Sequence, residues 1–383
     1  MMTLELLIQK IDELFETYLD VWEDVCNLES PTDCKEGVDA VGRYFAAKGR
    51  EFGWKVEILP QAVSGDVVVL TMNPDTPGQP IALSGHIDTV HPVGSFGTLA
   101  VHRDKTKIYG PGVTDCKGGA VAALYAMDAL ARCGFTDRPV MLLLQSDEEK
   151  GSALSGYSTI RSICEKAQNA AAFLNCEPSS AGQAILTRKG ILRYEFAIRG
   201  KAAHSADCAN GANAIAEAAH KILALEAMKD CAGLTCNCGV ISGGTVANVV
   251  AEECRFIADI RFATAKEMEQ ARQTVQRVAG ETHVPGCVCT VTEVSRRPAM
   301  EKVEKNVDLL RRMNEIFAET GLPTLQASSG AGGSDAAYTT LAGIPCVDSV
   351  GTEGGGIHSI HEYGTLESMR TTAQRLAVTV WKL

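Results

Sequence analysis

Apolar residues recur at helical spacing at the start of the chain and predict a helix over Leu4–Cys26. The same spacing predicts further helices over Asp33–Arg50, Lys117–Arg132, Ser155–Glu165, Ala212–Met228, Lys266–Val278, Lys302–Thr320, Asp335–Leu341 and Leu366–Trp381. Short apolar or alternating runs predict strands over Lys55–Leu59, Asp66–Met72, Ile81–Ser84, Val140–Gln145, Ala171–Leu174, Ile191–Ile198, Cys236–Ile241, Glu253–Phe262, Cys287–Val294 and Pro345–Val350.

The order of these elements predicts an α/β fold with an insertion. In residues 1–189 and 296–383 strands mostly alternate with helices, which predicts a mixed, mostly parallel sheet flanked by helices. In residues 190–295 the order is strand-helix-strand-strand-helix-strand, which is typical of a ferredoxin-like α+β domain. We therefore expect a main domain in two parts and one inserted domain.

Charge and composition narrow the possible partners. The formal net charge is −11, which disfavours binding to the phosphates of nucleic acids. No apolar run is long enough to span a bilayer, and the first residues lack the basic start and apolar run of a signal peptide. We therefore expect a cytoplasmic protein with no membrane partner, whose 14 scattered cysteines stay reduced.

Candidate chemistry lies at or just beyond the ends of predicted strands. Five segments carry imidazole or carboxylate groups: His86 with Asp88, Asp115, Asp147–Glu149, Glu177, and His358 with His361. Each segment alone has an ordinary explanation, such as a helix-capping aspartate or a solvated acidic turn. Together they gather where open α/β sheets bind ligands, and imidazole with carboxylate is a donor set that suits zinc. Because residues two apart in an extended strand face the same way, Asp88 could orient the ring of His86.

These segments, in this order, resemble the dizinc family of glutamate carboxypeptidase of the carboxypeptidase G type, aminoacylase, acetylornithine deacetylase and succinyl-diaminopimelate desuccinylase. The resemblance covers most of the chain, including the Gly330–Tyr338 segment and the inserted domain, and is greatest to the carboxypeptidase G branch. It implies that residues 1–189 and 296–383 form the catalytic domain and that residues 190–295 form a dimerisation or lid domain. It also implies two zinc ions per chain, for which cobalt or manganese can substitute.

The resemblance assigns roles to individual residues. His86 and Glu177 would bind one zinc, His358 and Glu149 the other, and Asp115 would bridge both. Glu148 would be the general base, Asp88 would orient His86, and His361 would stay outside the ligand set. Cys116 stands where the family commonly has an aspartate, at a position that often follows a cis peptide bond.

The implied reaction is hydrolysis of an amide bond beside a free carboxylate in a small peptide or an N-acyl amino acid. His204 would stabilise the oxyanion, although a histidine that caps the next helix is the simpler explanation from the residues alone. Asn248 matches a substrate-contacting position of the family, and Arg261 and Arg297 match its carboxylate-binding arginines. Arginine suits this role because its guanidinium can bind a carboxylate through two hydrogen bonds. Either arginine could instead form a surface ion pair. Gly332 and Gly333 would let the backbone approach the substrate.

Other functions remain open from the sequence. The runner-up within the enzyme class is an N-acyl amino acid deacylase; a binding protein with an inactive centre and a phosphate-binding enzyme are weaker alternatives, since no glycine-rich loop has the P-loop ending. The inserted domain predicts a homodimer in which His204 serves the partner's zinc site. Its open sheet edge would carry the apolar residues Val240, Ile241, Val246, Val249 and Val250.

Overall fold

The structure, a computed structural model, describes residues 2–180, 182–229 and 233–383. The chain divides into two compact units. The first unit comprises Met1–Thr187, Lys302–Gly330 and Ser334–Leu383, and the second unit comprises Arg188–Glu301 with Ala331–Gly333. The second unit thus contains the expected insertion and, in addition, a short glycine-containing loop from later in the chain.

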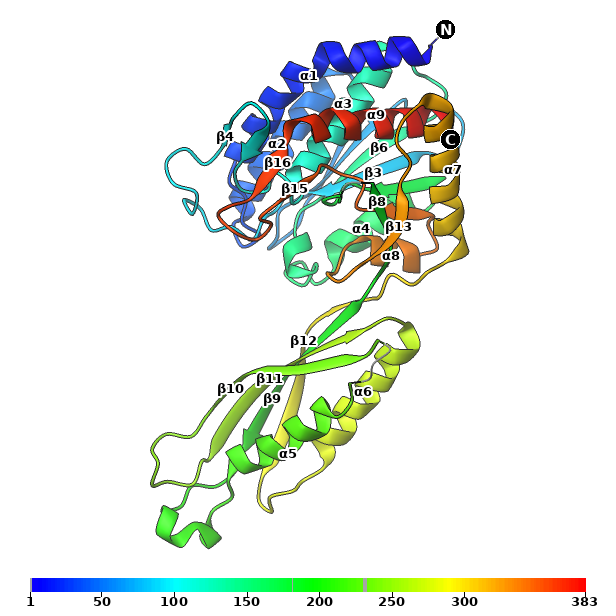
Figure 1. Ribbon diagram of the computed structural model, residues 1–383. Coiled ribbons are helices and arrows are strands. Elements are labelled where there is room, and N and C mark those ends of the chain that lie inside the picture. The colour runs from blue at the N-terminus through cyan, green and yellow to red at the C-terminus, as the bar shows by residue number, and fades with distance from the viewer. Residues whose placement is uncertain (1, 181, 230–232) are drawn as a thin grey trace. The chain divides into compact units, whose positions relative to one another are not determined.

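The first unit is built on an eight-stranded sheet (Figure 1). Its strands, in spatial order, are β1 (Lys55–Leu59), β2 (Val67–Met72), β6 (Val140–Gln145), β3 (Ile81–His86), β7 (Ala172–Asn175), β14 (Cys346–Asp348), β8 (Gln183–Arg188) and β13 (Gln326–Gly330). The four central strands, β6, β3, β7 and β14, run parallel, and antiparallel pairs flank them. The predicted mixed, mostly parallel sheet is confirmed.

Helices cover both faces of this sheet. One face carries α1 (Leu4–Asn27), α2 (Lys35–Glu51), α3 (Lys117–Arg132), α7 (Glu304–Thr320) and α9 (Leu366–Lys382), which share one hydrophobic core. The helices α4 (Ser158–Ala167) and α8 (Ala336–Leu341) pack on the sheet outside this core (Figure 1). The first turn of α3 packs against the backbone that follows β7. Glycine at position 119 allows this contact, since a Cβ there would lie 1.9 Å from the Cys176 carbonyl oxygen. This close approach fixes the position of the turn that precedes α3.

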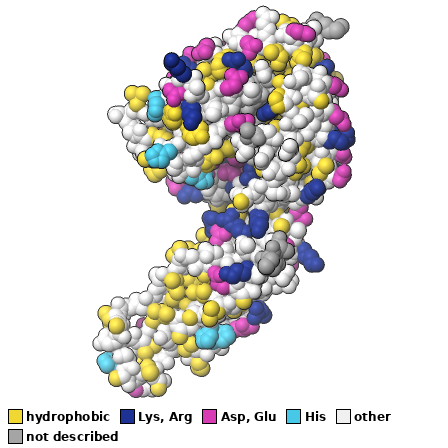
Figure 2. All heavy atoms as spheres, viewed as in Figure 1, with side chains coloured by type: hydrophobic (Ala, Val, Ile, Leu, Met, Phe, Trp, Pro, Cys, Tyr) yellow, Lys and Arg dark blue, Asp and Glu magenta, His cyan; other side chains and the backbone are white. Residues whose placement is uncertain are grey.

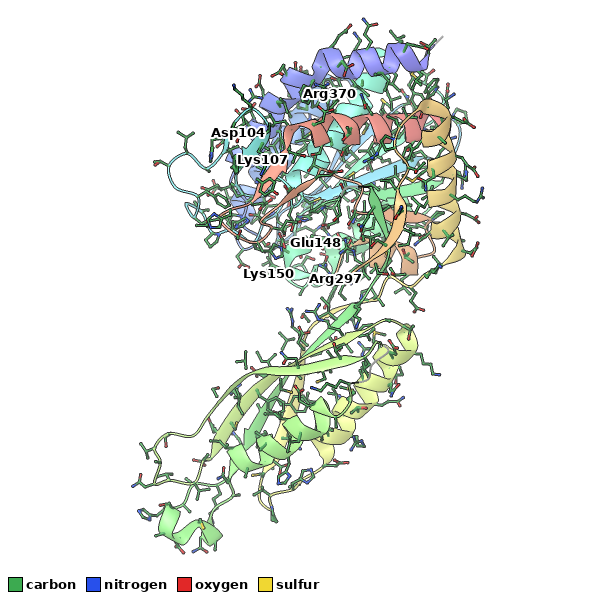
Figure 3. All side chains as sticks on the ribbon, viewed as in Figure 1. Asp104, Lys107, Glu148, Lys150, Arg297 and Arg370 are labelled. Atoms are coloured by element: carbon green, nitrogen blue, oxygen red, sulfur yellow. The ribbon has the colours of Figure 1, made fainter. Side chains whose placement is uncertain are left out.

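A small second sheet in the first unit was not expected from the sequence. It consists of β15 (Gly354–Gly355), β16 (Tyr363–Thr365), β5 (Lys107–Tyr109) and β4 (His102–Arg103). Tyr363 pairs with Tyr109, and the ammonium of Lys107, which is labelled in Figure 3, lies 3.8 Å from the centre of the Tyr363 ring. The sheet thereby joins the segment before α3 to the segment around residue 358.

The second unit has the predicted order of elements. Its elements are β9 (Gly190–Arg199), α5 (Ala214–Glu226), β10 (Thr235–Gly243), β11 (Glu253–Phe262), α6 (Ala265–Gly280) and β12 (Val288–Arg297). The strands form an antiparallel sheet in the order β10-β11-β9-β12, which confirms the ferredoxin-like arrangement. Phe196 and Phe256 stack in its core with ring centres 4.7 Å apart, and Thr264 and Glu267 cap α6 reciprocally.

A buried ion pair holds α5 to the segment that follows α6. Glu217 and Lys221 lie 3.1 Å apart, and both side chains are almost fully buried. The Glu217 carboxylate also accepts the backbone amides of His283 and Val284, at 2.8 and 2.6 Å, while Lys221 donates to the carbonyl of Val278 at 2.7 Å. The charges are therefore paired and hydrogen-bonded, as a buried ion pair requires.

The exposed edge of the second unit matches the prediction only in part. The strand β10 is an edge strand, and Val240, Ile241 and Val246 are more than half exposed. Hydrophobic side chains gather on the visible face of this unit (Figure 2). Val250 was wrongly placed at the edge: its side chain is buried, and its backbone amide donates to the carbonyl of Ala203 at 2.8 Å.

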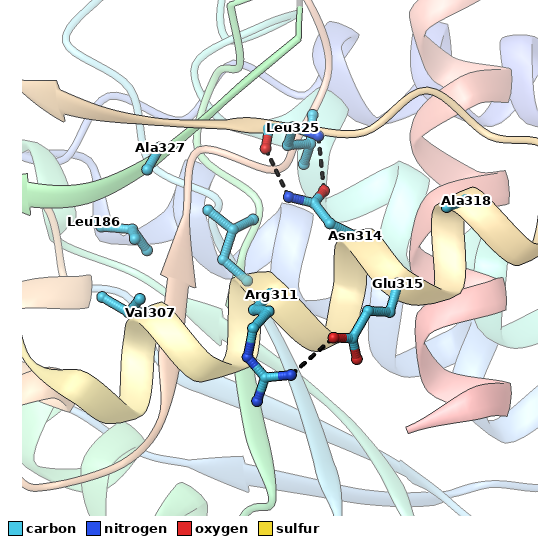
Figure 4. A pocket seen from close by; sticks show the side chains of 9 residues that line it. Leu186, Val307, Arg311, Asn314, Glu315, Ala318, Leu325 and Ala327 are labelled. Carbon is cyan, nitrogen blue, oxygen red and sulfur yellow. Dashed lines mark hydrogen bonds and ion pairs between the residues drawn. The ribbon is translucent and has the colours of Figure 1, made fainter.

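A shallow apolar hollow lies between α7 and the edge strand β13 in the first unit (Figure 4). At its rim, Asn314 binds both backbone groups of Leu325 at 2.8 Å, and Arg311 pairs with Glu315 at 2.8 Å. Among the described residues, no helix is long and apolar enough to cross a membrane.

Candidate metal centre

Parallel strands bring three of the predicted segments to one edge of the sheet. The strand β3 ends at His86, β6 leads into the short helix η1 (Glu148–Lys150), and β7 leads to Glu177. The register pairs His86 with Gln145 and Ser84 with Asn175. Since the carboxyl ends of parallel strands meet at the same edge, the imidazole and the carboxylates converge there.

Asp115, in the turn before α3, lies between the two predicted histidine ligands. Its Oδ1 is 3.0 Å from His86 Nε2, and its Oδ2 is 3.2 Å from His358 Nε2. The same nitrogen of His86 is 3.9 Å from Glu177 Oε1, and that of His358 is 3.3 Å from Glu149 Oε2. The five side chains thus form one cluster with the aspartate at its centre.

The acidic members of this cluster repel one another in a buried place. Burial, and next the nearby Glu148 carboxylate, raise the pKa of Glu177 well above its ordinary value. Burial raises the pKa of Glu149 to about 7. Burial also opposes the ionisation of Asp115, but hydrogen bonds to His358 and His86 outweigh it and lower the Asp115 pKa.

The histidines respond in the opposite direction. Hydrogen bonds to Asp115 and Glu149 raise the pKa of His358 to about 10. Burial would lower the pKa of His86, but the carboxylates of Asp115, Asp88 and Glu177 raise it well above its usual range. The cluster therefore favours positive charge at its centre. Imidazole and carboxylate donors around such a centre fit divalent zinc, and the groups His86–Asp115–Glu149 and His86–Cys116–Glu177 each have donor atoms within 4.8 Å of one another.

Asp88 is fully buried beneath this cluster and links its parts. Its carbonyl oxygen is 3.0 Å from His86 Nδ1, and its carboxylate oxygen is 3.4 Å from the same nitrogen. The carboxylate also accepts the backbone amides of Glu148 and Glu149, at 3.1 and 3.2 Å, and the hydroxyl of Thr32 at 2.7 Å. Asp88 therefore orients η1 as well as the His86 ring, a second contact that the sequence did not suggest.

Sequence reasoning missed Glu362, a fully buried carboxylate under the turn that carries Asp115. Its two oxygens accept the backbone amides of Gly112, Thr114 and Asp115, at 3.2, 2.9 and 3.0 Å. His91 Nε2 lies 2.9 Å from the same carboxylate. The sequence did offer one indication of this role: Glu362 directly follows His361, in one of the five segments that carry candidate site residues.

The rest of the predicted segments behave as follows. The Asp115–Cys116 peptide bond is cis, as the resemblance implied. Lys117 is fully buried, and its ammonium donates to the Leu28 carbonyl at 2.7 Å. His361 is exposed, and its backbone amide donates to Ser359 Oγ at 3.2 Å.

His204 and Asn248 lie side by side in the second unit. His204 forms a bridge with Val249, and the Asn248 carbonyl accepts the amide of Ser205 at 2.9 Å. The ring of His204 caps the short helix η2 (Ser205–Asn210), because Nδ1 accepts the Ala206 amide at 3.2 Å. A nitrogen that accepts leaves the ring proton on Nε2, so the exposed side of the ring is a hydrogen-bond donor.

The two predicted substrate arginines differ in their surroundings. Arg261 already pairs with Asp259, through contacts of 2.5 and 3.2 Å, which is the ion pair that the sequence left open. Arg297 is buried at the end of β12 and packs on Gly333, where a Cβ would lie 2.5 Å from Arg297 Cδ. Gly333 thus makes room for an arginine of its own chain, whereas a Cβ at Gly332 would meet its nearest atom at 3.9 Å.

Comparisons with known proteins agree with this architecture. Residues 82–382 match the profile of peptidase family M20/M25/M40. The chain is 30% identical to carboxypeptidase G2 of Pseudomonas sp. (strain RS-16) over 88% of its length and 82% of that protein. It is 28% identical to an acetylornithine deacetylase of Myxococcus xanthus over 52% of its length and 54% of that protein.

The fold is also similar to solved structures. A tripeptidase from Staphylococcus aureus superposes with a TM-score of 0.79 and 21% identity, over 95% of this chain and 96% of that one. These matches confirm the resemblance drawn from the five segments. The chain belongs to peptidase family M20/M25/M40 and is a carboxypeptidase-like metallopeptidase.

Proposed function

We propose that the chain is a zinc-dependent hydrolase that cleaves an amide or peptide bond beside a free carboxylate, as a glutamate carboxypeptidase does. The observation that carries this proposal is the placement of Asp115, whose two carboxylate oxygens face His86 and His358 separately. One carboxylate shared in this way is what a site for a pair of metal ions requires.

The donor set supports two zinc ions per chain. His86 and Glu177 would hold one ion, His358 and Glu149 the other, and Asp115 both. When bound, the pair would polarise the scissile carbonyl and make water acidic enough to attack near neutral pH. Cobalt or manganese can substitute, because geometry and availability decide which metal is bound.

Glu148 is the general base of this proposal. This residue, labelled in Figure 3, lies on η1, and its backbone amide donates to Asp88 Oδ1 at 3.1 Å. The carboxylate takes a proton from the attacking water and delivers it to the leaving nitrogen. General acid–base groups typically contribute about 10²–10⁴-fold to the rate, and this one acts in two proton transfers.

Substrate recognition is assigned to the second unit. Arg297, Arg261, Gly332 and Gly333 would position the carboxylate end of the substrate, with Arg261 released from its ion pair with Asp259, and Asn248 would contact the substrate beside His204. The similarity to carboxypeptidase G2 favours a peptide or an N-acyl glutamate as the substrate. The partial similarity to an acetylornithine deacetylase favours the second candidate, an N-acyl amino acid deacylase.

His204 is the proposed oxyanion donor, acting in the site of a partner chain. Its Nδ1 accepts an amide, which leaves Nε2–H free to donate to the developing negative charge. Homodimerisation is supported by β10, an edge strand of its sheet on which Val240 and Ile241 are more than half exposed.

The function is tested with a substrate panel and product mass spectrometry. The panel contains N-acyl glutamates, other N-acyl amino acids and dipeptides, each as the free acid and as the C-terminal amide, with Glu148→Gln as the background control. We expect cleavage of free acids and little cleavage of amides, because a buried arginine would lose a charge-assisted bond. Cleavage of small N-acyl groups alone would favour the deacylase, and equal rates on acids and amides would refute the carboxylate requirement.

A further inference from the structure

Asp147 opens the acidic run Asp147–Glu149, and the proposed mechanism gives this residue no part. In the chain it lies between the end of β6 and the start of η1, and its side chain is fully buried. A carboxylate that is taken out of water is costly unless hydrogen bonds replace its hydration shell. The hydrogen bonds that Asp147 makes therefore indicate its role.

The carboxylate of Asp147 is held by donors from the segment that follows η1. Its Oδ1 accepts the Thr159 hydroxyl at 2.5 Å, and its Oδ2 accepts the Ser155 amide at 2.9 Å. The Asp147 carbonyl also accepts the Ser152 amide at 2.9 Å. Thr159 is fully buried as well and lies in the first turn of α4, a helix that packs on β6. Asp147 thus ties the start of η1 to α4 and to the loop between them.

A second buried carboxylate, that of Asp88, holds the backbone of η1 itself. It accepts the amides of Glu148 and Glu149, at 3.1 and 3.2 Å. Asp88 also contacts His86, so it acts on the metal cluster as well as on η1. Within the described chain, the hydrogen bonds of Asp147 reach no candidate metal ligand. Of the two carboxylates, Asp147 is therefore the one that acts on η1 alone.

We propose that Asp147 is a positioning residue that fixes the carboxylate of Glu148 for proton transfer. This inference rests on the proposed function, in which Glu148 is the general base. Because Glu148 directly follows Asp147, a rotation of the backbone at Asp147 moves the Glu148 side chain with it. A displacement of about 1 Å from the reactive geometry can cost about 10²-fold in rate. The contacts of Asp147 with α4 prevent this displacement without touching substrate or metal.

The first test removes the contact from either side. Asp147→Asn keeps the shape of the side chain but turns an NH₂ group toward one of its two donors. We expect kcat to fall about 10–10²-fold while KM and the zinc content stay near parental values, because only the base is displaced. Thr159→Val removes the hydroxyl and should lower kcat in the same direction, whereas Thr159→Ser keeps the hydroxyl and should restore it.

The matched control for this test is Ser158→Ala, on the same helix. The Ser158 hydroxyl bonds Gln61 and the Ser155 carbonyl, not Asp147, so kcat should stay unchanged. Circular dichroism checks the fold of each variant. Parental kcat in Asp147→Asn, or equal losses in the valine and serine variants of Thr159, would overturn the proposal.

A double variant separates positioning of the base from a general loosening of the site. Glu148→Gln should have the same residual kcat with and without Asp147→Asn, since a positioning residue has no effect once the group that it positions is gone. A further loss in the double variant would show that Asp147 acts through another group, and would overturn the proposal while leaving the proposed function intact. If the parent chain cleaves no member of the substrate panel, the proposed function itself fails, and this inference fails with it.

Discussion

Glu362 accepts the backbone amide of Asp115 at 3.0 Å, so one buried carboxylate fixes the turn that presents the central carboxylate of the cluster. We expect Glu362→Gln to weaken zinc binding, because an amide would turn a donor group toward backbone N–H donors. Such supporting contacts typically contribute about 10–100-fold to metal affinity. Chelator competition measures the affinity, and circular dichroism checks that the fold is kept.

A matched control for this prediction is His91→Gln. His91 contacts the same carboxylate at 2.9 Å but touches none of the amides of the turn. It should weaken zinc binding less than Glu362→Gln does. Unchanged affinity in a folded Glu362→Gln protein would show that the turn holds its shape without this contact.

Substitution of the proposed base, Glu148, and of the proposed bridging ligand, Asp115, should have different effects. Glu148→Gln should retain both metal ions and the fold but lose turnover by about 10²–10⁴-fold or more. Asp115→Ala should instead lose metal, since both histidines face its oxygens. Elemental analysis and steady-state kinetics measure the two effects, and near-parental turnover by Glu148→Gln would mean that another group is the base.

The two glycines of the Ala331–Gly333 loop should respond differently to alanine. Gly333→Ala places a Cβ 2.5 Å from Arg297 Cδ and 2.9 Å from its Nη1, so the buried arginine must move. Overpacking of this kind costs about 1–3 kcal/mol, and we expect a higher KM for free-acid substrates as well. Gly332→Ala, with its nearest atom at 3.9 Å, is the control for overpacking and should leave the free energy of unfolding unchanged. An equal change in the free energy of unfolding in the two variants would contradict the packing of Arg297 against Gly333.

The buried pair in the second unit predicts a dependence of stability on pH. Burial opposes ionisation of Glu217, but the Val284 amide, Lys221 and the His283 amide outweigh it and lower the Glu217 pKa. The unfolded chain would bind a proton near pH 4.3, so Glu217 stabilises the fold above about that pH and loses this contribution as the pH falls through its lower folded value.

All three tryptophans lie in the first unit, so their fluorescence would not report on the stability of the second unit. Hydrogen exchange of the α5 and β9 amides measures the effect instead. Glu217→Gln should lose protection at pH 7, by about 3–5 kcal/mol, since it leaves the buried Lys221 ammonium without its carboxylate. The difference from the parent chain should shrink below about pH 4. A difference that stays constant across this range would show that the carboxylate is not ionised in the fold.

Subunit mixing tests the assignment of His204 to the partner's site. Glu148→Gln and His204→Ala should each be nearly inactive alone. After exchange of subunits, one site of each mixed dimer carries both native groups, so activity should recover to about a quarter of the parental value. Proven exchange without recovery would place His204 in the site of its own chain or outside catalysis.

Long periodic segments made most of the fold predictable. The predicted α3 and β6 have the observed bounds, because each is a nearly continuous apolar run that ends at polar or turn residues. The strands β4, β5, β15 and β16 could not be predicted, since two or three residues carry no period and their partners lie far away in the sequence. The polar edge strand β13 was missed for a related reason: it contains Ser328 and Ser329 and no apolar run.

The candidate site was predictable at the level of residue type and order. His86, Asp115 and Glu177 each follow a strand or open a helix, so the topology brings them together. The contact of Glu362 with three amides could not be predicted, because it depends on the shape of a turn rather than on a period or a motif. The burial of Val250 depends in the same way on how a loop folds back on Ala203.

The candidate metal ligands lie far apart in the sequence, and this separation affects when the site can form during synthesis. His86 and Asp115 emerge from the ribosome early, whereas His358 and Glu362 follow only after the whole second unit has been synthesised. At about 5–20 residues per second, tens of seconds separate these events. The nascent chain therefore carries an incomplete set of donors for most of its synthesis. In the proposed centre, zinc binding and cleavage would begin only when the last of these donors arrives.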